Sequence, residues 1–270
     1  MDPEGHLYVG DSQNFSVRKL RTDGTVETVK YDLNVSKIFK PLALAYDHKG
    51  NILIADGENN KIIKINRKGA VKTVAGDGSK GFKDGSPLEA TFNGPRGLTL
   101  DNYGNVIVAD TDNHAIRVIY LSGDNKRVAT IGGTGSVGYC DGNFMSSQFN
   151  KPYGVAVDAY DNILVADSRN NRIRIIHSDG TVSTVAGDGK EGFKDGLARC
   201  AQFNCPKGIA IDLSGDIIVS DGYNHSIRKI YSSYIQNSTM GLLKDCKMKI
   251  LMFIDLFLKS VVHLSFEAMN

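Results

Sequence analysis

The amino-acid sequence predicts an all-β fold built from copies of one unit of four antiparallel strands. Five times, an Asp is followed nine residues later by a second Asp, and an Asn stands three residues further on. Apolar runs typical of strands flank each triplet, whereas helical periodicity is absent up to about residue 230. Self-similarity at a long period marks a repeat architecture, so the repeat predicts the fold before any single residue does. The triplets are Asp2, Asp11 and Asn14; Asp47, Asp56 and Asn59; Asp101, Asp110 and Asn113; Asp158, Asp167 and Asn170; and Asp212, Asp221 and Asn224.

Each complete unit predicts four strands separated by turns. For example, a first strand GLTLD (97–101) and a tight turn lead into a second strand NVIVAD (105–110). The turn that carries the Asn follows, and then a third strand with the sequence IRVI (116–119). A Gly-containing hairpin, clearest as SDGTV (178–182), leads to a fourth strand such as VSTVAG (182–187). Pro stands just before the first strand, where a strand tolerates it, at Pro41, Pro95, Pro152 and Pro206.

Repeated sheets of four antiparallel strands, none of which can bury both faces alone, predict the blades of a β-propeller. The propeller covers residues 1–230, in which about five blades are visible. The first unit lacks its first strand, and six blades at this period would need about 320 residues, more than the chain has. We therefore expect an incomplete ring or a fragment of a longer one, with a closed five-bladed ring as the alternative. The units lie near 2–40, 41–94, 95–151, 152–205 and 206–230.

The repeats resemble a known family. The stretches GLTLDNYGNVIVADTDNHAIRVI and GVAVDAYDNILVADSRNNRIRII look like NHL repeats, in the version with a long TVAGxGxxGxxDG segment between blades. The resemblance covers roughly Asp2 to Ile230. It implies a propeller, commonly six-bladed and TolB-like, that binds proteins, peptides or RNA; a minority of related propellers are enzymes.

The repeated Asp and Asn residues are interpreted as framework, because paired Asp at strand ends commonly accept hydrogen bonds from backbone amides. The structural positions are Asp56, Asn59, Asp110, Asn113, Asp167, Asn170, Asp221 and Asn224. Calcium on these turns is the alternative. An Arg recurs in the third strand, as in Arg117 and Arg174. It is interpreted either as framework, paired with nearby Asp, or as a radial basic set that contacts a partner.

Partner contacts are expected on the face that carries the Asn turns and the long interblade loops 76–94, 133–151 and 187–205. Repeated aromatics in these loops, such as Phe92 and Phe149, are expected to hold each loop in the groove between blades. Residues that do not repeat are the better candidates for specific contacts. They are Lys80, Glu89, Ser136, Met145, Lys190, Glu191 and Arg199, to which Arg117 and Arg174 are added for the RNA-binding hypothesis.

No cofactor, metal site or catalytic residue is predicted. The string GxGxxG occurs three times, starting at Gly76, Gly133 and Gly187, but it follows a fourth strand and opens no helix, so dinucleotide binding is not expected. His114 and His225 stand at turn positions that hold Asn elsewhere, and the predicted first strands carry no His for a metal in the central channel.

Composition agrees with a globular chain of nearly balanced charge: 32 Lys and Arg against 30 Asp and Glu. The N-terminus MDPEGHLYVG shows no signal peptide, and no transmembrane span is predicted. Cys200 and Cys205 flank Phe203 and could pair in an oxidising compartment, which the sequence leaves open.

Residues 231–270 abandon the repeat. Ile250 to Phe266 is strongly apolar, with Asp255, Lys259 and His263 spaced four apart. This pattern predicts an amphipathic helix, or else a mispredicted terminus that replaces lost blades.

Taken together, the sequence favours a non-catalytic propeller scaffold that binds a protein or peptide through its loop-rich face. A metal-dependent enzyme of the lactonase or lyase kind and an RNA-binding module are the alternatives.

Overall fold

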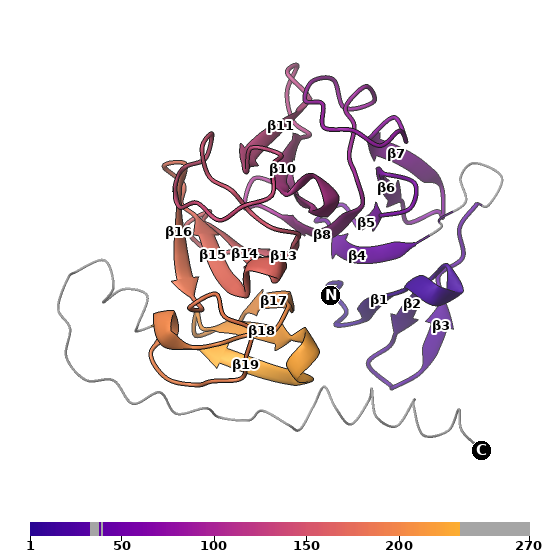
Figure 1. Ribbon diagram of the computed structural model, residues 1–270. Coiled ribbons are helices and arrows are strands. Elements are labelled where there is room, and N and C mark those ends of the chain that lie inside the picture. Colours follow the sequence, from indigo (N-terminus) through magenta and orange to yellow (C-terminus); the bar gives the residue numbers. More distant parts are fainter. Residues whose placement is uncertain (33–37, 39, 233–270) are drawn as a thin grey trace.

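Five antiparallel β-sheets follow one another in chain order around a common centre (Figure 1). The computed structural model describes residues 1–32, 38 and 40–232. Its strands are joined by turns and loops, which include five short 3₁₀ helices among the described residues. The arrangement confirms the predicted all-β propeller of antiparallel blades. The expectation for the tail falls on residues 233–270 and lies outside the described residues.

The second, third and fourth sheets have the four strands that the sequence predicts, and the fourth gains a two-residue edge strand, β12. The first and fifth sheets each have three strands within the described part of the chain. In the first sheet the strand nearest the centre corresponds to the second strand of a unit, as expected from the missing first strand. The strands are β1 (Leu7–Asp11), β2 (Ser16–Leu20) and β3 (Val26–Thr28); β4 (Pro41–Tyr46), β5 (Ile52–Asp56), β6 (Lys61–Ile65) and β7 (Val71–Ala75); β8 (Pro95–Leu100), β9 (Val106–Asp110), β10 (Ala115–Tyr120) and β11 (Arg127–Gly132); β12 (Gly142–Asn143), β13 (Pro152–Val157), β14 (Ile163–Asp167), β15 (Arg172–Ile176) and β16 (Thr181–Ala186); and β17 (Pro206–Ile211), β18 (Ile217–Asp221) and β19 (Ser226–Ile230).

Each sheet is buried against its neighbours in the ring. All five residues of β5, β9 and β14 are buried, because alternate side chains of a strand face the sheets on either side. Between the second and third sheets, for instance, Leu53 and Ile62 pack against Val108 together with Phe92 from the interblade loop. Burying one such Phe contributes roughly 1.5–3 kcal/mol. The loop aromatics therefore fill the groove between blades, as predicted.

The innermost strands β4, β8, β13 and β17 lie side by side around the centre. Their backbones come so close that a side chain has no room at one position of β8. A Cβ atom added to Gly97 would lie 2.0 Å from the carbonyl oxygen of Tyr153 in β13. Gly97, and likewise Gly154 against the carbonyl oxygen of Lys207, is thus required by the approach of the neighbouring blade rather than by a turn.

Among the residues that the structure describes, no helix has the length and apolar character needed to cross a membrane.

We expect Gly97→Ala to lower the free energy of unfolding by about 1–3 kcal/mol, because β8 and β13 must separate to admit the methyl group. Urea denaturation monitored by fluorescence checks this. Gly24→Ala is the matched control, since Gly24 sits at φ +86° with open space around it and should cost only the left-handed strain of about 1–2 kcal/mol. A stable Gly97→Ala protein, losing less than Gly24→Ala, would contradict the close approach of these strands.

Candidate functional site

The Asn turns and the long interblade loops share one face of the propeller, as the sequence analysis expects. The 3₁₀ turns that carry the Asn residues are η1 (Ser12–Asn14), η2 (Thr111–Asn113), η3 (Ser168–Asn170) and η5 (Gly222–Asn224); η4 (Ala198–Cys200) lies within a long loop. The amide of Asp112 in η2 donates to the carbonyl of Asn93 at 3.0 Å, and that of Arg169 in η3 donates to Asn150 at 3.0 Å. These bonds tie each turn to the end of the preceding loop. We call this surface the loop face, and the side with the tight hairpins the hairpin face.

The repeated Asp at the end of the second strand is a fully buried hydrogen-bond acceptor. The carboxylate of Asp110 accepts from the amide of Asn93 at 2.8 Å and from Asn113 Nδ2 at 2.8 Å. Arg117 Nη1 donates to the same carboxylate at 2.7 Å. The pattern recurs at Asp167 and Asp221, and its Asn and backbone parts recur at Asp56. The structure therefore places these residues in the framework.

The repeated Arg holds the preceding interblade loop against its own blade. Arg117 Nε and Nη2 donate to Asp84 Oδ1 at 3.1 and 2.6 Å, and Nη2 also donates to the carbonyl of Lys83 at 2.9 Å. The guanidinium lies between two loop rings, with its centre 5.0 Å from the Phe82 ring and 5.1 Å from the Phe92 ring. The separation of 33 residues between Arg and loop Asp recurs in Arg174 with Asp141 and in Arg228 with Asp195. We call this arrangement the Arg clasp.

This geometry corrects the proposal of Arg117 and Arg174 as partner-binding residues. Both side chains are completely buried and already pair with two carboxylates each. A partner or an RNA phosphate has no access to their guanidinium groups, and of the two interpretations given from sequence the framework one agrees with the structure.

Burial raises the pKa of Asp110 and of Asp167 to about 6, although the nearby Arg and the hydrogen-bond donors act in the opposite direction. A raised pKa in the folded state means that burial costs the ionised carboxylate more free energy than its ion pair and hydrogen bonds recover. A buried carboxylate without its Arg would be less favourable still, so the folded protein keeps the ion pair intact.

The Asn or His that follows each Asn turn also has a framework role. His114, at φ 53°, accepts the amide of Lys151 on Nδ1 at 3.0 Å, and Asn60 and Asn171 accept the equivalent loop amides at 2.9 Å. Burial, with a smaller effect of Lys151, lowers the pKa of His114, which agrees with an unprotonated accepting nitrogen. The interpretation of this position as a hydrogen-bonding turn position is confirmed.

The GxGxxG segments form loops. Gly76 and Gly78 have φ of 96° and 101°, and a Cβ on Gly76 would lie 2.5 Å from the carbonyl oxygen of Asn60. The described residues after these glycines begin no α-helix, which a dinucleotide fingerprint needs for its phosphates. Cys200 and Cys205 are free thiols in the structure.

The non-repeated loop residues chosen from sequence are all exposed but do not converge on one site. Lys80 and Glu191 bridge to Phe92 and Phe203, at the segments that lead into the innermost strands. Met145 follows the edge strand β12, at the outside of the fourth sheet. Of the set, Lys80 alone lines a cavity at the centre of the loop face. The remainder are Glu89, Ser136, Lys190 and Arg199.

Sequence analysis missed the centre of the loop face, where the inner strands begin. A cavity of about 330 Å³ lies there, lined by the middle residues of three Pro-x-Gly entries: Arg96, Tyr153 and Lys207. Turn residues Asp112 and Arg169 also line it. A second cavity of about 200 Å³ shares Arg96 and Asp112 with the first. We call the two cavities together the mouth. The signal was present in the sequence, because the middle residue varies between units (Leu42, Arg96, Tyr153, Lys207) while its neighbours hardly do.

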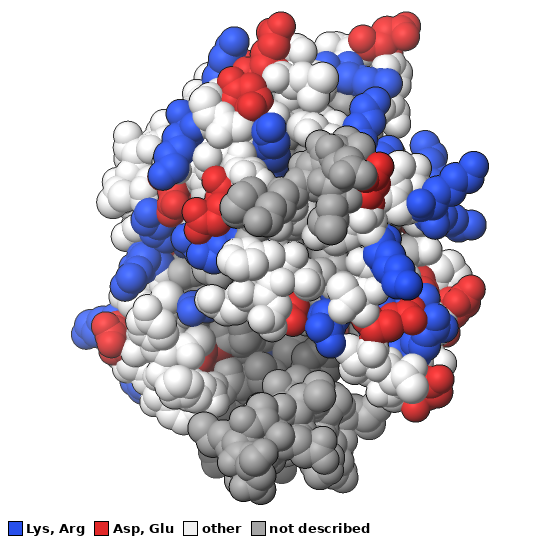
Figure 2. Space-filling model, turned by 90° about the vertical axis from the view of Figure 1, so that its right-hand side faces the viewer, with Lys and Arg blue, Asp and Glu red and all other residues white. Residues whose placement is uncertain are grey.

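The mouth carries an excess of uncompensated positive charge. Lys151 pairs with Asp112 at 2.6 Å and Lys40 with Glu58 at 3.0 Å, which lowers the pKa of Glu58. By contrast, Arg96, Arg169 and Lys207 make no ion pair with a carboxylate of the described residues. Figure 2 shows Lys and Arg interspersed with Asp and Glu on an outer side of the molecule, so this local excess is not a general property of the surface.

Tyrosines orient two of these cations. The Arg96 guanidinium lies 5.5 Å from the centre of the Tyr153 ring, and Lys207 Nζ lies 5.9 Å from the same ring. Lys207 Nζ also lies 5.3 Å from the Tyr223 ring. Cation–π contacts of this kind restrict the rotamers of long side chains, so the charges are positioned before a ligand arrives.

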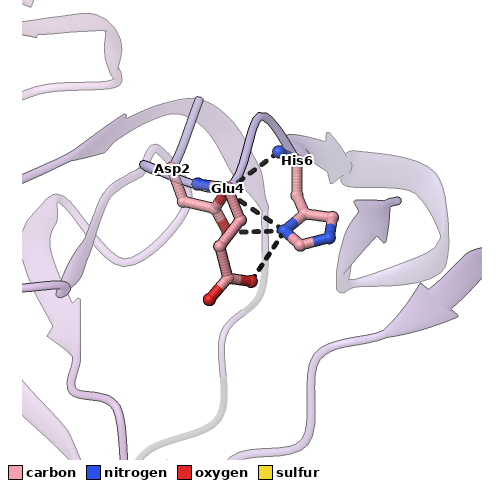
Figure 3. A group of neighbouring side chains, drawn as sticks. All are labelled: Asp2, Glu4 and His6. Carbon is pink, nitrogen blue, oxygen red and sulfur yellow. Dashed lines mark hydrogen bonds and ion pairs between the residues drawn. The ribbon is translucent and has the colours of Figure 1, made fainter. Parts of the chain in front are cut away.

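A second cluster, Asp2, Glu4 and His6, has the residue types of a metal site but is explained by a turn (Figure 3). Their ligand atoms lie within 4.8 Å of one another. Asp2 and His6, however, take the places of Asp47 and Asn51 in the repeated turn: His6 Nδ1 contacts Asp2 Oδ2 at 3.1 Å as Asn51 Nδ2 contacts Asp47 Oδ2 at 2.7 Å. Burial raises the pKa of Asp2, but hydrogen bonds from His6 and Tyr8 outweigh it and the net direction is down.

Three segments of the chain match the family model of the NHL repeat: residues 92–119, 149–176 and 203–230. Each starts at the buried Phe of an interblade loop and ends in the third strand of a blade. The chain is an NHL-repeat β-propeller. The family resemblance found in the sequence is confirmed, and the matched segments contain both the buried Asp and the Arg of the clasp.

The NHL repeats are shared with larger proteins. The chain is 37% identical over 144 residues to NHL repeat-containing protein 2 of Homo sapiens, which covers 51% of the chain and 19% of that protein. It thus spans less than a fifth of the length of this curated relative. Among solved structures, a protein of unknown function from Bacteroides thetaiotaomicron has a TM-score of 0.67 at 20% identity, covering 83% of this chain and 56% of that one. Virginiamycin B lyase from Staphylococcus aureus has a TM-score of 0.55 at 18% identity, covering 86% and 65%. At these identities the likeness shows the fold alone.

We expect Arg174→Met to lower the free energy of unfolding by about 3–5 kcal/mol, because Asp167 is left buried without its partner. Arg174→Lys should recover only part of this loss, since an ammonium cannot reproduce the forked contacts to both carboxylates. Urea denaturation measures the loss, with Lys72→Met on the exposed side of β7 as the control. Equal stability of the Arg174→Met and Lys72→Met proteins would contradict the Arg clasp.

The fifth sheet should respond to acid through Lys229, whose Nζ contacts Asp212 Oδ2 at 2.9 Å and Asp216 Oδ2 at 2.8 Å. The hydrogen bond from Lys229 lowers the pKa of Asp212; for Asp216 burial raises the pKa, but Lys229 and Ser232 outweigh it. Carboxyl groups with depressed folded pKa values stabilise the fold above their ordinary pKa of about 3.8, and this contribution is lost as pH falls through the folded values. Lys229→Met should therefore destabilise the protein at pH 7 and by clearly less at about pH 3. An unchanged difference from wild type at the two pH values, measured by urea denaturation, would count against this linkage.

Proposed function

We propose that the chain is a rigid propeller scaffold that binds a protein or peptide partner on its loop face, with the mouth as the anchoring site. The observation that carries the proposal is the mouth itself: a preformed cavity of about 330 Å³ with cations held in place by Tyr153 and Tyr223. This volume lies at the lower end of the range for ligand sites, and the lining is mostly polar, which suits a charged or polar ligand group.

The framework supports this proposal physically. The Arg clasp and the buried Phe residues fix the long loops to the blades, so a partner would order little chain on binding. The loops surround the mouth and differ between units at exposed positions such as Lys80, Ser136 and Glu191. These positions would supply contacts around a common anchor.

Binding is favoured over catalysis by the ionisable groups at the mouth. General acid–base catalysis needs a group whose pKa lies near the working pH. Glu58 is paired with Lys40, which lowers its pKa, and the neighbouring Asp112 is paired with Lys151. The positioned Arg and Lys are suited to recognition instead.

Selection of random 12-residue peptides by display on the immobilised chain tests the proposal. We expect enriched peptides whose affinity falls tenfold or more in Tyr153→Ala, because that ring positions both Arg96 and Lys207; tenfold corresponds to about 1.4 kcal/mol. Tyr103→Ala is the matched control, since Tyr103 is 76% exposed and lies in a turn of the hairpin face. Failure to enrich any peptide, or binding that depends on Tyr103 and not on Tyr153, would overturn the proposal.

A further inference from the structure

The mouth is better matched to one class of peptide than to peptides in general. Resting on the proposed function, we propose that its ligand is an acidic peptide segment, whose Asp or Glu side chains pair with Arg96, Lys207 and Arg169.

The positive charges of the mouth favour an anionic ligand. The clasp residues Arg117 and Arg228 are each neutralised by two Asp, whereas half-buried Arg172 donates instead to the carbonyl groups of Asn170 and Asp188. At the mouth, Arg96 and Lys207 are half-buried, and neither forms an ion pair or hydrogen bond with a carboxylate of the described residues, although the charge of Arg96 helps to lower the pKa of Glu58. Partly desolvated cations attract an opposite charge more strongly than fully solvated ones, because the local dielectric constant is lower.

The arrangement favours carboxylates that are presented along an extended chain. Arg96 lines both cavities of the mouth, so a ligand that contacts it can continue from the larger cavity toward Lys80 in the smaller one. An Arg guanidinium binds a carboxylate through two parallel hydrogen bonds, which adds direction to the attraction. Two or more acidic side chains in one peptide would thus reach Arg96 and Lys207 together.

Nucleic acid fits the mouth less well than an acidic peptide. Single-stranded RNA is bound by stacking its bases on free aromatic faces. Tyr153 instead has two cations, Arg96 and Lys207, within 6 Å of its ring centre. Asp112 and Glu58 also line the smaller cavity, where the backbone N–H groups of a peptide can donate to them, whereas a phosphodiester backbone carries no N–H donor.

Fluorescence anisotropy with defined probes tests the inference on the full chain. The probes are a labelled Gly-Asp-Glu-Asp-Glu-Gly peptide, its amide counterpart Gly-Asn-Gln-Asn-Gln-Gly, and a labelled single-stranded RNA of about 12 nucleotides. We expect the acidic peptide to bind at least tenfold more tightly than the amide peptide, with an affinity that falls as salt is raised. The double variant Arg96→Gln, Lys207→Gln should lose tenfold or more of the acidic peptide's affinity. Lys49→Gln and Lys68→Gln, at exposed turns of the hairpin face, are the matched charge controls and should leave it unchanged.

The outcomes separate this inference from the proposed function. Equal affinity for the two peptides, or no effect of the double variant, overturns the acidic-peptide inference. Tighter binding of the RNA than of the acidic peptide, lost in the double variant, also overturns it in favour of nucleic acid. If display selection enriches peptides that depend on Tyr153 but carry no acidic residues, the proposed function stands and this inference fails. If no peptide binds at the mouth, both fail.

Discussion

The loop face depends on one interaction, the buried ion pair between the Asp at the end of a second strand and the Arg seven residues later in the third strand. The same Arg reaches across to the Asp and the carbonyl groups of the preceding interblade loop, and the rings of two loop aromatics enclose it. A single buried guanidinium therefore joins strand, turn and loop. A buried charge without its partner is strongly unfavourable, so we expect the strand, the turn and the loop to be ordered together.

This constraint explains why the long loops can be repetitive at some positions and variable at others. Their repeated residues, such as Phe82, Asp84 and Phe92, are held by the clasp and the interblade core. Their remaining positions are free to vary, and they surround a mouth whose own residues vary from blade to blade. In the function that we propose, stability and recognition are separate: the framework sets the position of the loops, and the mouth would set the chemistry of what they bind.

Much of this organisation could be predicted from the chain's own periodicity. The Asp and Asn of each unit, the four strands, the shared loop face and the groove-filling Phe92 follow from fixed spacings and strand alternation, which are local properties. The partners of Arg117 could not be read in this way, because Asp84 belongs to the preceding unit and meets it only when the blades pack. The constant separation of 33 residues between the Arg and the loop Asp was nevertheless visible in the sequence. The mouth was missed because its lining residues come from different units and lie close together only when the blades are assembled around the centre of the propeller.

The central claim is that the clasp fixes the preceding loop to the blade and so preforms the loop face. Hydrogen–deuterium exchange of the Arg174→Met protein tests it most directly, read at the amides of 138–149 and compared with those of β5 and β9. The account predicts faster exchange in 138–149, where Arg174 contacts the carbonyl groups of Cys140 and Gln148, with β5 and β9 unchanged under the same conditions. Unchanged protection of 138–149, or an equal rise in all three segments, would contradict it.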